Sequence, residues 1–218
     1  MPPFADSSPS GSFATLRRFA RPAAAEEERC ELCGVSLAST HRHLLEMANH
    51  KVTCACDPCA LRFQDVIEGR FKLIPRDVRV LVDFRLTDAM WENFALPINL
   101  AFFFYNTPQK KVTALYPSPA GATESLLSLS AWEELVSNNT ALSSMQPDVE
   151  ALLVNRVKAP EYYIAPIDVC YELVGLIRMH WKGFSGGDEV WTKLEEFFDR
   201  LKSQGIPLCA EDTEGTRA

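Results

Sequence analysis

The chain has 218 residues, 47% of them hydrophobic, and a formal net charge of −7, which leaves room for a small metal-binding module and one domain with its own core. Its longest uninterrupted apolar run, residues 100–105, is far too short to span a membrane. Residues 1–70 hold eight basic and nine acidic side chains, so they lack the clustered Lys and Arg of a phosphate-binding finger. We therefore expect a cytoplasmic protein that binds neither membranes nor nucleic acid.

Residues 1–28, rich in Pro, Ser and Ala, predict a flexible lead-in. The next segment, residues 29–69, contains five of the seven cysteines. Four of them form two Cys-x-x-Cys pairs with 22 residues between the pairs: Cys30, Cys33, Cys56 and Cys59. Two residues between cysteines allow a tight turn to aim both thiolates at one ion, and two such turns complete a tetrahedral shell. The spacing predicts a zinc-binding module with these four cysteines as the metal ligands.

The same four sulfurs also suit iron, as in rubredoxin-like electron carriers. Rubredoxin-type loops usually have glycine after both pairs, whereas here Gly34 follows the first pair and Ala60 follows the second. We therefore assign zinc as the cofactor and keep iron as the alternative. Because Cys54 stands two residues before Cys56, an arrangement in which Cys54 replaces Cys56 as a ligand also stays open.

The segments after each pair predict a hairpin and then a helix. Residues 40–46 alternate as a strand does, and residues 50–53 supply its hairpin partner. Residues 59–68 place apolar side chains at mostly helical spacing, and Gly69 ends that helix. A cysteine turn, a hairpin and a second pair at a helix start follow the order of a treble-clef-like zinc module.

His41 and His43 are two residues apart, so both imidazoles face the same way if this segment is a strand. With Cys54 across the hairpin, they offer the ligands of a second metal site. We favour the other interpretation, in which the histidines pack or hydrogen-bond around the cysteine turns and Cys54 is a small buried side chain. The protein then holds one ion per chain.

Residues 70–204 predict an α+β domain with a mainly antiparallel sheet and C-terminal helices. Strands are expected at residues 78–85, 98–105, 111–116, 151–157 and 162–167. Shorter helices are expected at residues 88–94 and 130–136. The second and third strands flank a Thr-Pro-Gln-Lys turn and therefore form a hairpin.

Two long helices are expected to end the domain. Asp168 is predicted to cap the first helix, and residues 185–188 are predicted to cap the second. The Gly-Gly pair at 186–187 can present backbone amides to an anion, but we favour a simple sharp connection between the helices. Residues 205–218 predict a flexible tail.

Few features point to catalysis. Asp83, Asp88 and Glu92 have no evident histidine partner, and three of the four histidines stand beside the cysteines. The sequence contains neither a G-x-S-x-G elbow nor a phosphate loop. We therefore expect that the protein is not an enzyme.

Two motifs resemble those of a known family. The first is C-E-L-C-G…H-R-H-L-L…C-x-C-x-x-C-A, preceded by L-R-R-F-A-R-P, and the second is G-L-I-R-M-H-W-K-G-F-S-G-G-D-E-V-W. From about residue 16 to about residue 201, the chain resembles an uncharacterised, actinobacterial-type family of Cys-rich proteins. Members are typically encoded beside uptake nickel–iron hydrogenases. The resemblance therefore implies a setting in hydrogenase assembly or support.

We expect a non-enzymatic, zinc-containing accessory or adaptor protein that acts through contacts with a protein partner. The resemblance implies that this partner is a hydrogenase subunit or a maturation factor. One alternative is a rubredoxin-like electron carrier with iron in the same four cysteines. A second alternative is a nucleic-acid-binding zinc finger protein, which the scattered basic residues disfavour.

Overall fold

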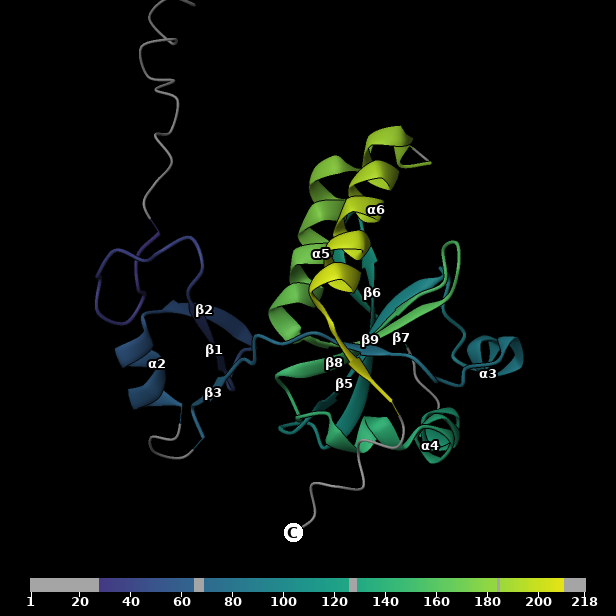
Figure 1. Cartoon of the computed structure of the whole chain (residues 1–218), viewed down its shortest axis with the longest axis horizontal. Helices are drawn as coiled ribbons and strands as arrows, with labels where there is room; N and C mark the ends of the chain where they lie inside the picture. Colours follow the sequence, from purple (N-terminus) through teal and green to yellow (C-terminus); the bar gives the residue numbers. More distant parts are fainter. Residues whose placement is uncertain (1–27, 65–68, 126–128, 184, 210–218) are drawn as a thin grey trace, which may run out of the picture.

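The computed structural model describes residues 28–64, 69–125, 129–183 and 185–209. Apart from its last residue, the predicted lead-in lies outside this described part. Figure 1 shows a small N-terminal body beside a larger body built around a central sheet. We call the described residues from 28 to 74 the N-terminal module and those from 75 to 209 the sheet domain. Among the described helices, none combines the length and the apolar character needed to cross a membrane.

The N-terminal module is a three-stranded antiparallel sheet with one helix (Figure 1). β1 (Arg42–Glu46) and β2 (Lys51–Ala55) form the predicted hairpin, and β3 (Phe71–Leu73) pairs with the other edge of β1. α2 (Asp57–Phe63) begins two residues earlier than the helical spacing suggested. Because β3 belongs to this sheet, the sheet continues past residue 69, where the sequence placed the end of the module.

The sheet domain contains a seven-stranded sheet with the order β10-β4-β9-β8-β5-β6-β7. All neighbouring strands are antiparallel except β10 and β4, which are parallel. The strands are β4 (Arg79–Leu81), β5 (Leu100–Asn106), β6 (Lys111–Ser118), β7 (Gly121–Ser125), β8 (Glu150–Asn155), β9 (Glu161–Pro166) and β10 (Ile206–Leu208). The helices are α3 (Asp88–Glu92), α4 (Leu129–Asn138), the 3-10 helix η1 (Thr140–Ser144), α5 (Ile167–His180) and α6 (Gly187–Gln204). The domain is therefore a mixed α+β fold.

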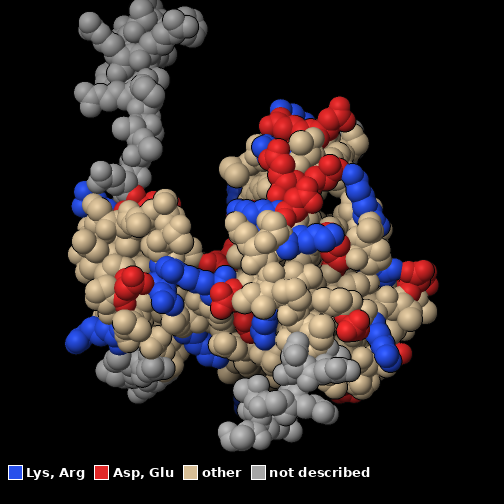
Figure 2. All heavy atoms as spheres, viewed as in Figure 1, with Lys and Arg blue, Asp and Glu red and all other residues tan. Residues whose placement is uncertain are grey.

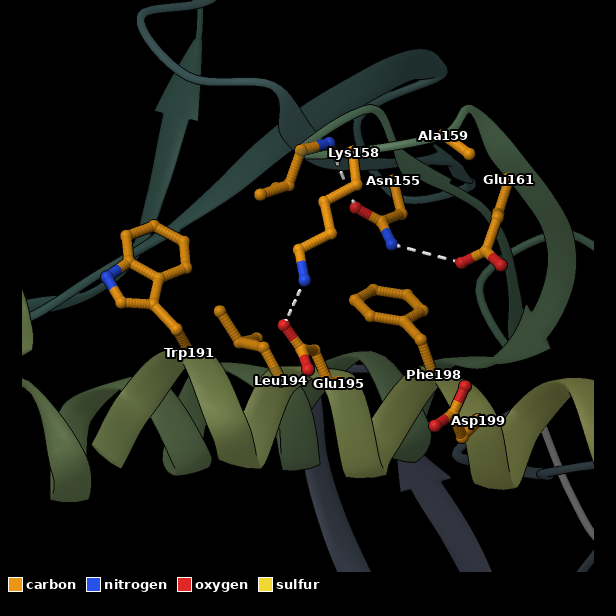
Figure 3. A pocket seen from close by; sticks show the side chains of 10 residues that line it. Asn155, Lys158, Ala159, Glu161, Trp191, Leu194, Glu195, Phe198 and Asp199 are labelled. Atoms are coloured by element: carbon orange, nitrogen blue, oxygen red, sulfur yellow. Dashed lines mark hydrogen bonds and ion pairs between the residues drawn. The ribbon is translucent and has the colours of Figure 1, made fainter. Parts of the chain in front are cut away.

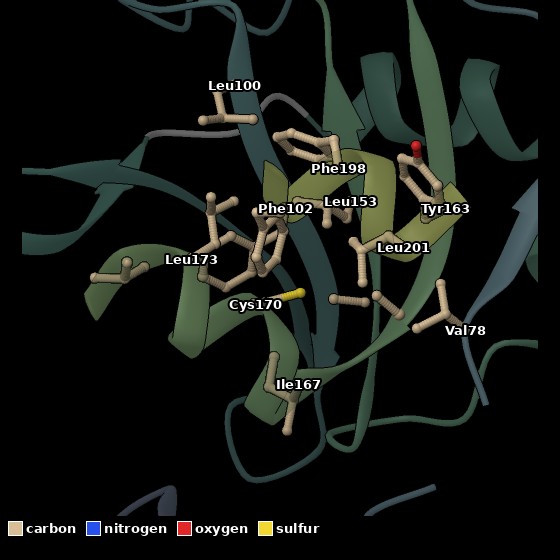
Figure 4. Packing of buried hydrophobic residues seen from close by; sticks show 14 of the residues in the cluster. Val78, Leu100, Phe102, Leu153, Tyr163, Ile167, Cys170, Leu173, Phe198 and Leu201 are labelled. Carbon is tan, nitrogen blue, oxygen red and sulfur yellow. The ribbon is translucent and has the colours of Figure 1, made fainter. Parts of the chain in front are cut away.

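α5 and α6 cover one face of this sheet and form the larger apolar core with it (Figure 4). Since side chains alternate along a strand, Phe102 of β5 points to this face, where it meets the helix pair. Cys170 of α5 and Phe198 of α6 lie in the same core. Tyr163 of β9 stacks on Phe198 with ring centroids 6.0 Å apart.

The opposite face of the sheet is covered by α3, α4 and η1, which form a second core. Phe103 of β5 points to this side and stacks on Trp132 of α4 with ring centroids 5.8 Å apart. Both faces of β5 are therefore buried. This explains why the sequence of this strand reads as a continuous apolar run rather than an alternating one.

One face of the β1–β2 hairpin packs on the small core that contains Cys30, Cys56 and Cys59, and the other face packs on the sheet domain. Leu44 belongs to the small core of the N-terminal module. The neighbouring Leu45 and its cross-strand partner Val52 pack into the large core of the sheet domain instead. Lys72 of β3 adds a polar contact, with its Nζ 2.5 Å from the carboxylate of Asp148. Apolar packing and an ion pair thus join the module to the domain.

The sheet differs from the sequence prediction at β4, β7 and β10. The strand expected at residues 78–85 is reduced to the three residues of β4. β7 was not predicted. β10 lies where a flexible tail was expected, and the N–H of Ile206 donates to the carbonyl of Val78 at 2.8 Å. β10 is short, contains a proline and pairs with a strand far away in the sequence, so no local pattern indicates it. Residues 210–218 lie outside the described part.

The predicted cap of α5 is wrong, whereas the N-cap of α6 lies within the predicted residues 185–188 but involves no side chain. Pro166 is the N-cap residue of α5, and Asp168 lies in the first turn, where its Oδ1 accepts from the N–H of Val169 at 2.9 Å. The N-cap of α6 is Gly186, which makes no side-chain cap and has a left-handed φ of +87°. A Cβ at this position would lie 2.8 Å from Cγ1 of Val190, so the sharp connection requires glycine.

Candidate metal centre

Four sulfurs converge in the N-terminal module, those of Cys30, Cys33, Cys56 and Cys59. Their Sγ atoms all lie within 4.8 Å of one another, and those of Cys33 and Cys56 are 3.7 Å apart. Two sulfurs that bind a tetrahedral zinc at about 2.3 Å each are about 3.8 Å apart. This four-cysteine cluster therefore has the spacing to hold a metal ion.

The first pair lies on a tight turn. Gly34 follows Cys33 with a φ of +78°, which is in the left-handed region that glycine adopts without strain. Its N–H donates to the carbonyl of Cys30 at 2.8 Å. A bridge between Arg29 and Ser36 closes the turn. Cys30 is consequently buried, with 2% of its surface exposed, while Cys33 remains at the surface.

The second pair lies where β2 ends and α2 begins. Cys56 is the N-cap residue of α2 and still extended, with φ −71° and ψ 157°. Cys59 stands in the first turn of the helix. The chain changes direction at Cys56, so its sulfur reaches the four-cysteine cluster while that of Cys54, two residues earlier, lies in a different group. The structure thus does not bring Cys54 into the cluster in place of Cys56.

The thiols of Cys30 and Cys59 differ in how readily they ionise. Burial opposes ionisation of Cys30, but backbone N–H groups of Cys56, Leu32 and Cys33 donate to its sulfur and lower its pKa to about 6. Burial and the neighbouring sulfurs raise the pKa of Cys59 to about 12. Four sulfurs this close cannot all lose their protons unless a cation offsets the charge. The electrostatics of the cluster therefore favour a bound cation.

Glu31, which sequence analysis did not single out, connects the first cysteine turn to the hairpin. Its carboxylate accepts from Nζ of Lys51 at 2.5 Å and from the N–H of Cys54 at 3.1 Å. Lys51 and the N–H of Cys54 both hold the pKa of this carboxyl below its usual range. The N–H of Glu31 also donates to the carbonyl of Cys54 at 2.9 Å. These contacts place the first pair beside the second.

His41, His43 and Cys54 form a second group of metal-ligating atoms, which also lie within 4.8 Å of one another. This proximity is what the second-site alternative requires, although the sequence favoured a supporting role for these residues. In the described part of the chain, Nδ1 of His41 contacts the carbonyl of Ala38, and Nδ1 of His43 contacts Asp168 of the sheet domain. Cys54 is only half-buried.

The acidic residues considered for catalysis have a structural setting. Asp88, in the first turn of α3, forms an ion pair with Arg156. The guanidinium of Arg156 lies over the ring of Trp91, 5.5 Å from its centroid. The structure thus pairs Asp88 with an arginine rather than with a general base, and it leaves Asp83 and Glu92 exposed.

A surface pocket of about 540 Å³ lies between α6 and the turn from β8 to β9 (Figure 3). Trp191, Leu194 and Phe198 of α6 form its apolar wall. Lys158 reaches across the pocket to Glu195. No local sequence pattern indicates this pocket, because its two sides come from separate elements. An apolar wall with a charged rim is typical of a binding surface.

Residues 29–205 match a known family, described as "Family of unknown function (DUF5947)". The chain belongs to this family. The DUF5947 match includes both cysteine pairs, His41, His43 and every described helix. No curated protein and no solved structure matches the chain. The DUF5947 description assigns no activity.

Proposed function

We propose that the four-cysteine cluster holds a structural zinc ion in a treble-clef-type module. The convergence of four sulfurs, from a turn and a helix start, carries this proposal. The core of the module is small and consists of Cys30, Leu44, Ala55, Ala60 and Phe71, with partly buried neighbours. Because so few buried side chains stabilise a module only weakly, binding of the ion supplies much of the folding free energy.

Iron in the same cluster is the alternative, which makes the protein an electron carrier. The start of α2 favours zinc, because Ala60 follows the second pair in a helical conformation where rubredoxin-type loops have glycine. The colour and metal content of the purified protein distinguish the two. A colourless protein with stoichiometric zinc supports the proposal. A red protein that dithionite bleaches overturns it and favours electron transfer.

We further propose that the protein is a non-enzymatic accessory of a nickel–iron hydrogenase and binds one of its subunits or a maturation factor. The resemblance of the two sequence motifs supports the hydrogenase setting. Apolar surface supports contacts with a protein: Val35 and Leu61 of the N-terminal module are 51% and 63% exposed, and the pocket beside α6 has an apolar wall. A cytoplasmic setting keeps the cysteines reduced for metal binding.

Affinity purification from hydrogenase-producing cells tests this partner. We expect hydrogenase subunits or maturation factors to copurify with the tagged wild-type protein and to be lost with the Cys30→Ser variant, whose module lacks its ion. A deletion strain should show reduced hydrogen uptake, restored by the wild-type gene. Absence of these proteins from the eluate, together with normal hydrogen uptake in the deletion strain, overturns the accessory role.

Charge argues against the nucleic-acid alternative. Four basic side chains of the N-terminal module each pair with a carboxylate: Arg42 with Asp57, Lys51 with Glu31, Arg70 with Glu46 and Lys72 with Asp148. Figure 2 shows Lys and Arg at separate places on the module and acidic side chains over α5 and α6. Phosphate binding needs clustered, available cations. Salt-sensitive affinity for DNA or RNA would revive this alternative.

A further inference from the structure

His41, His43 and Cys54, here called the His–Cys cluster, lie where the N-terminal module meets the sheet domain. His43 and Cys54 are directly opposite each other across the β1–β2 hairpin. The His41 ring lies beside the His43 ring, with centroids 4.7 Å apart. The next cross-strand pair on this face, Leu45 and Val52, packs into the core of the sheet domain. The cluster thus lies on the opposite face of the hairpin from Leu44 and the small core of the module.

The hydrogen bonds of the two rings determine which nitrogen carries a proton. Nδ1 of His41 is 3.0 Å from the carbonyl oxygen of Ala38, and Nδ1 of His43 is 2.6 Å from Oδ2 of Asp168. A carbonyl and a carboxylate only accept hydrogen bonds, so each Nδ1 must donate. In a neutral imidazole the other nitrogen then has a free lone pair. Both Nε2 atoms are therefore available as metal ligands.

These two Nε2 atoms face each other at 3.1 Å. Two lone pairs at this distance repel, so a positive species near both nitrogens stabilises the arrangement. Two nitrogens that bind a tetrahedral zinc at about 2.0–2.1 Å each are about 3.3 Å apart. The rings therefore already have nearly the separation that a shared metal ion requires.

We propose that the His–Cys cluster is a second metal site, which binds one first-row divalent transition-metal ion through Nε2 of His41, Nε2 of His43 and Sγ of Cys54. Two imidazoles and one thiolate suit ions of the zinc type rather than magnesium or calcium. Three protein ligands leave one position for water or for a donor from another molecule, unlike the closed four-cysteine cluster. The His43 side chain is 29% exposed, so the site is open to solution.

The surroundings of the cluster support a cation. Asp168 completes a carboxylate–histidine pair of the kind that orients metal-binding imidazoles and increases their basicity. Glu28 adds a carboxylate oxygen 3.6 Å from Nδ1 of His41, and Glu31 bonds to the backbone of Cys54. Since Asp168 belongs to α5, the sheet domain supplies part of the metal environment. The site is therefore complete only when the module and the domain are docked.

Counting the zinc bound by the full-length protein tests the proposal. After dialysis against excess zinc, we expect about two ions per chain in the wild type and about one in both the His41→Ala/His43→Ala and Cys54→Ser variants. His50→Asn is the matched control, because His50 lies in the same hairpin, has a left-handed φ that asparagine tolerates and is outside the cluster. It should retain both ions.

A wild-type protein that binds a single ion, unchanged in the double histidine variant, overturns the second site. If the two Nε2 atoms share a proton in place of a metal ion, both proteins also bind a single ion, and the proposal is overturned in the same way. If the four-cysteine cluster binds no metal and the second site does, the wild type binds one ion and the double histidine variant binds none, so the two failures can be distinguished. Cobalt replacement separates the sites further, since only the four-cysteine site gives cobalt an environment of four thiolates.

Asp168→Asn tests the outer part of the site without removing a ligand. We expect the affinity for the second ion to fall about 10–100-fold while the first ion is retained. Asp188→Asn is the matched control, since Asp188 has the corresponding place in the first turn of α6 and does not contact the cluster. Equal affinities in the two variants would refute a role for Asp168 in positioning His43.

Discussion

The contact between Lys72 and Asp148 should contribute measurably to the docking of the N-terminal module on the sheet domain. Asp148 is fully buried, and its carboxylate accepts from Nζ of Lys72 at 2.5 Å and from the N–H and Oγ1 of Thr107 at 2.7 and 2.5 Å. Asp148 has a left-handed φ of +70°. Asp148→Asn is the cleanest perturbation, because asparagine also adopts this conformation and has the same size.

The contacts of Asp148 determine the cost of this substitution. The asparagine oxygen can still accept from the N–H of Thr107, and the threonine hydroxyl can rotate to accept from the new amide. The charge-assisted bond to Lys72 is lost, and such bonds contribute about 1.5–3 kcal/mol. Lys72 is 34% exposed and regains part of its hydration. We therefore expect the free energy of unfolding to fall by about 2 kcal/mol.

Urea denaturation of a double-mutant cycle with Lys72→Met isolates the pair. The coupling free energy between positions 72 and 148 should be about 1–2 kcal/mol. A second cycle with Lys111→Met and Glu124→Gln is the control, since Lys111 pairs with Glu124 on the surface and both side chains are about half exposed. The coupling of this surface pair should be less than about 1 kcal/mol. A coupling no larger than that of the surface pair refutes the reasoning that this contact joins module to domain.

Three further predictions follow from the fold and the candidate site. Cys59→Ser should lose the four-cysteine ion and unfold the N-terminal module while the sheet domain stays folded, as amide NMR spectra would show. Stoichiometric metal retained in this variant would contradict the assignment. Gly186→Ala should destabilise the protein by about 2–4 kcal/mol, through backbone strain and overlap of the new Cβ with Val190. Gly183→Ala, with φ +63° and nothing within 4 Å of the added Cβ, should cost only the backbone strain of about 1–2 kcal/mol. Equal melting temperatures of the two variants would contradict this. Phe103→Ala should cost about 3–5 kcal/mol in urea unfolding, and Tyr105→Ala, at a position 37% exposed, much less.

The elements that sequence analysis predicted best are those with a local signal. The alternation in the first hairpin, the turn between β5 and β6, and the cysteine pairs all depend on residues close together in the chain. The spacing of Cys30, Cys33, Cys56 and Cys59 was sufficient to predict the cluster that the structure assembles, because two short turns can bring four sulfurs together without information from the remaining chain.

What sequence analysis missed depends on contacts between distant segments. The position of Asp168 after a predicted strand suggested a helix cap, but its carboxylate forms a hydrogen bond with His43, which lies 125 residues earlier. β10 exists because the chain leaving α6 at Gly205 passes directly against β4: a Cβ at this glycine would lie 2.6 Å from Cγ2 of Val80. Neither partner can be identified from the residues next to Asp168 or Gly205.

The choice between Cys54 and Cys56 shows where local reasoning ends. On a regular strand, residues two apart point to the same side, so both sulfurs would face one ion. β2 ends at Ala55 and the chain enters α2 through Cys56, which breaks the alternation at that residue. Cys54 therefore lies on the same face of the hairpin as Val52, which packs against the sheet domain, while the Cys56 side chain points into the four-cysteine cluster. The bend at a single residue thus divides the cysteines between a cluster inside the module and one at its junction with the domain.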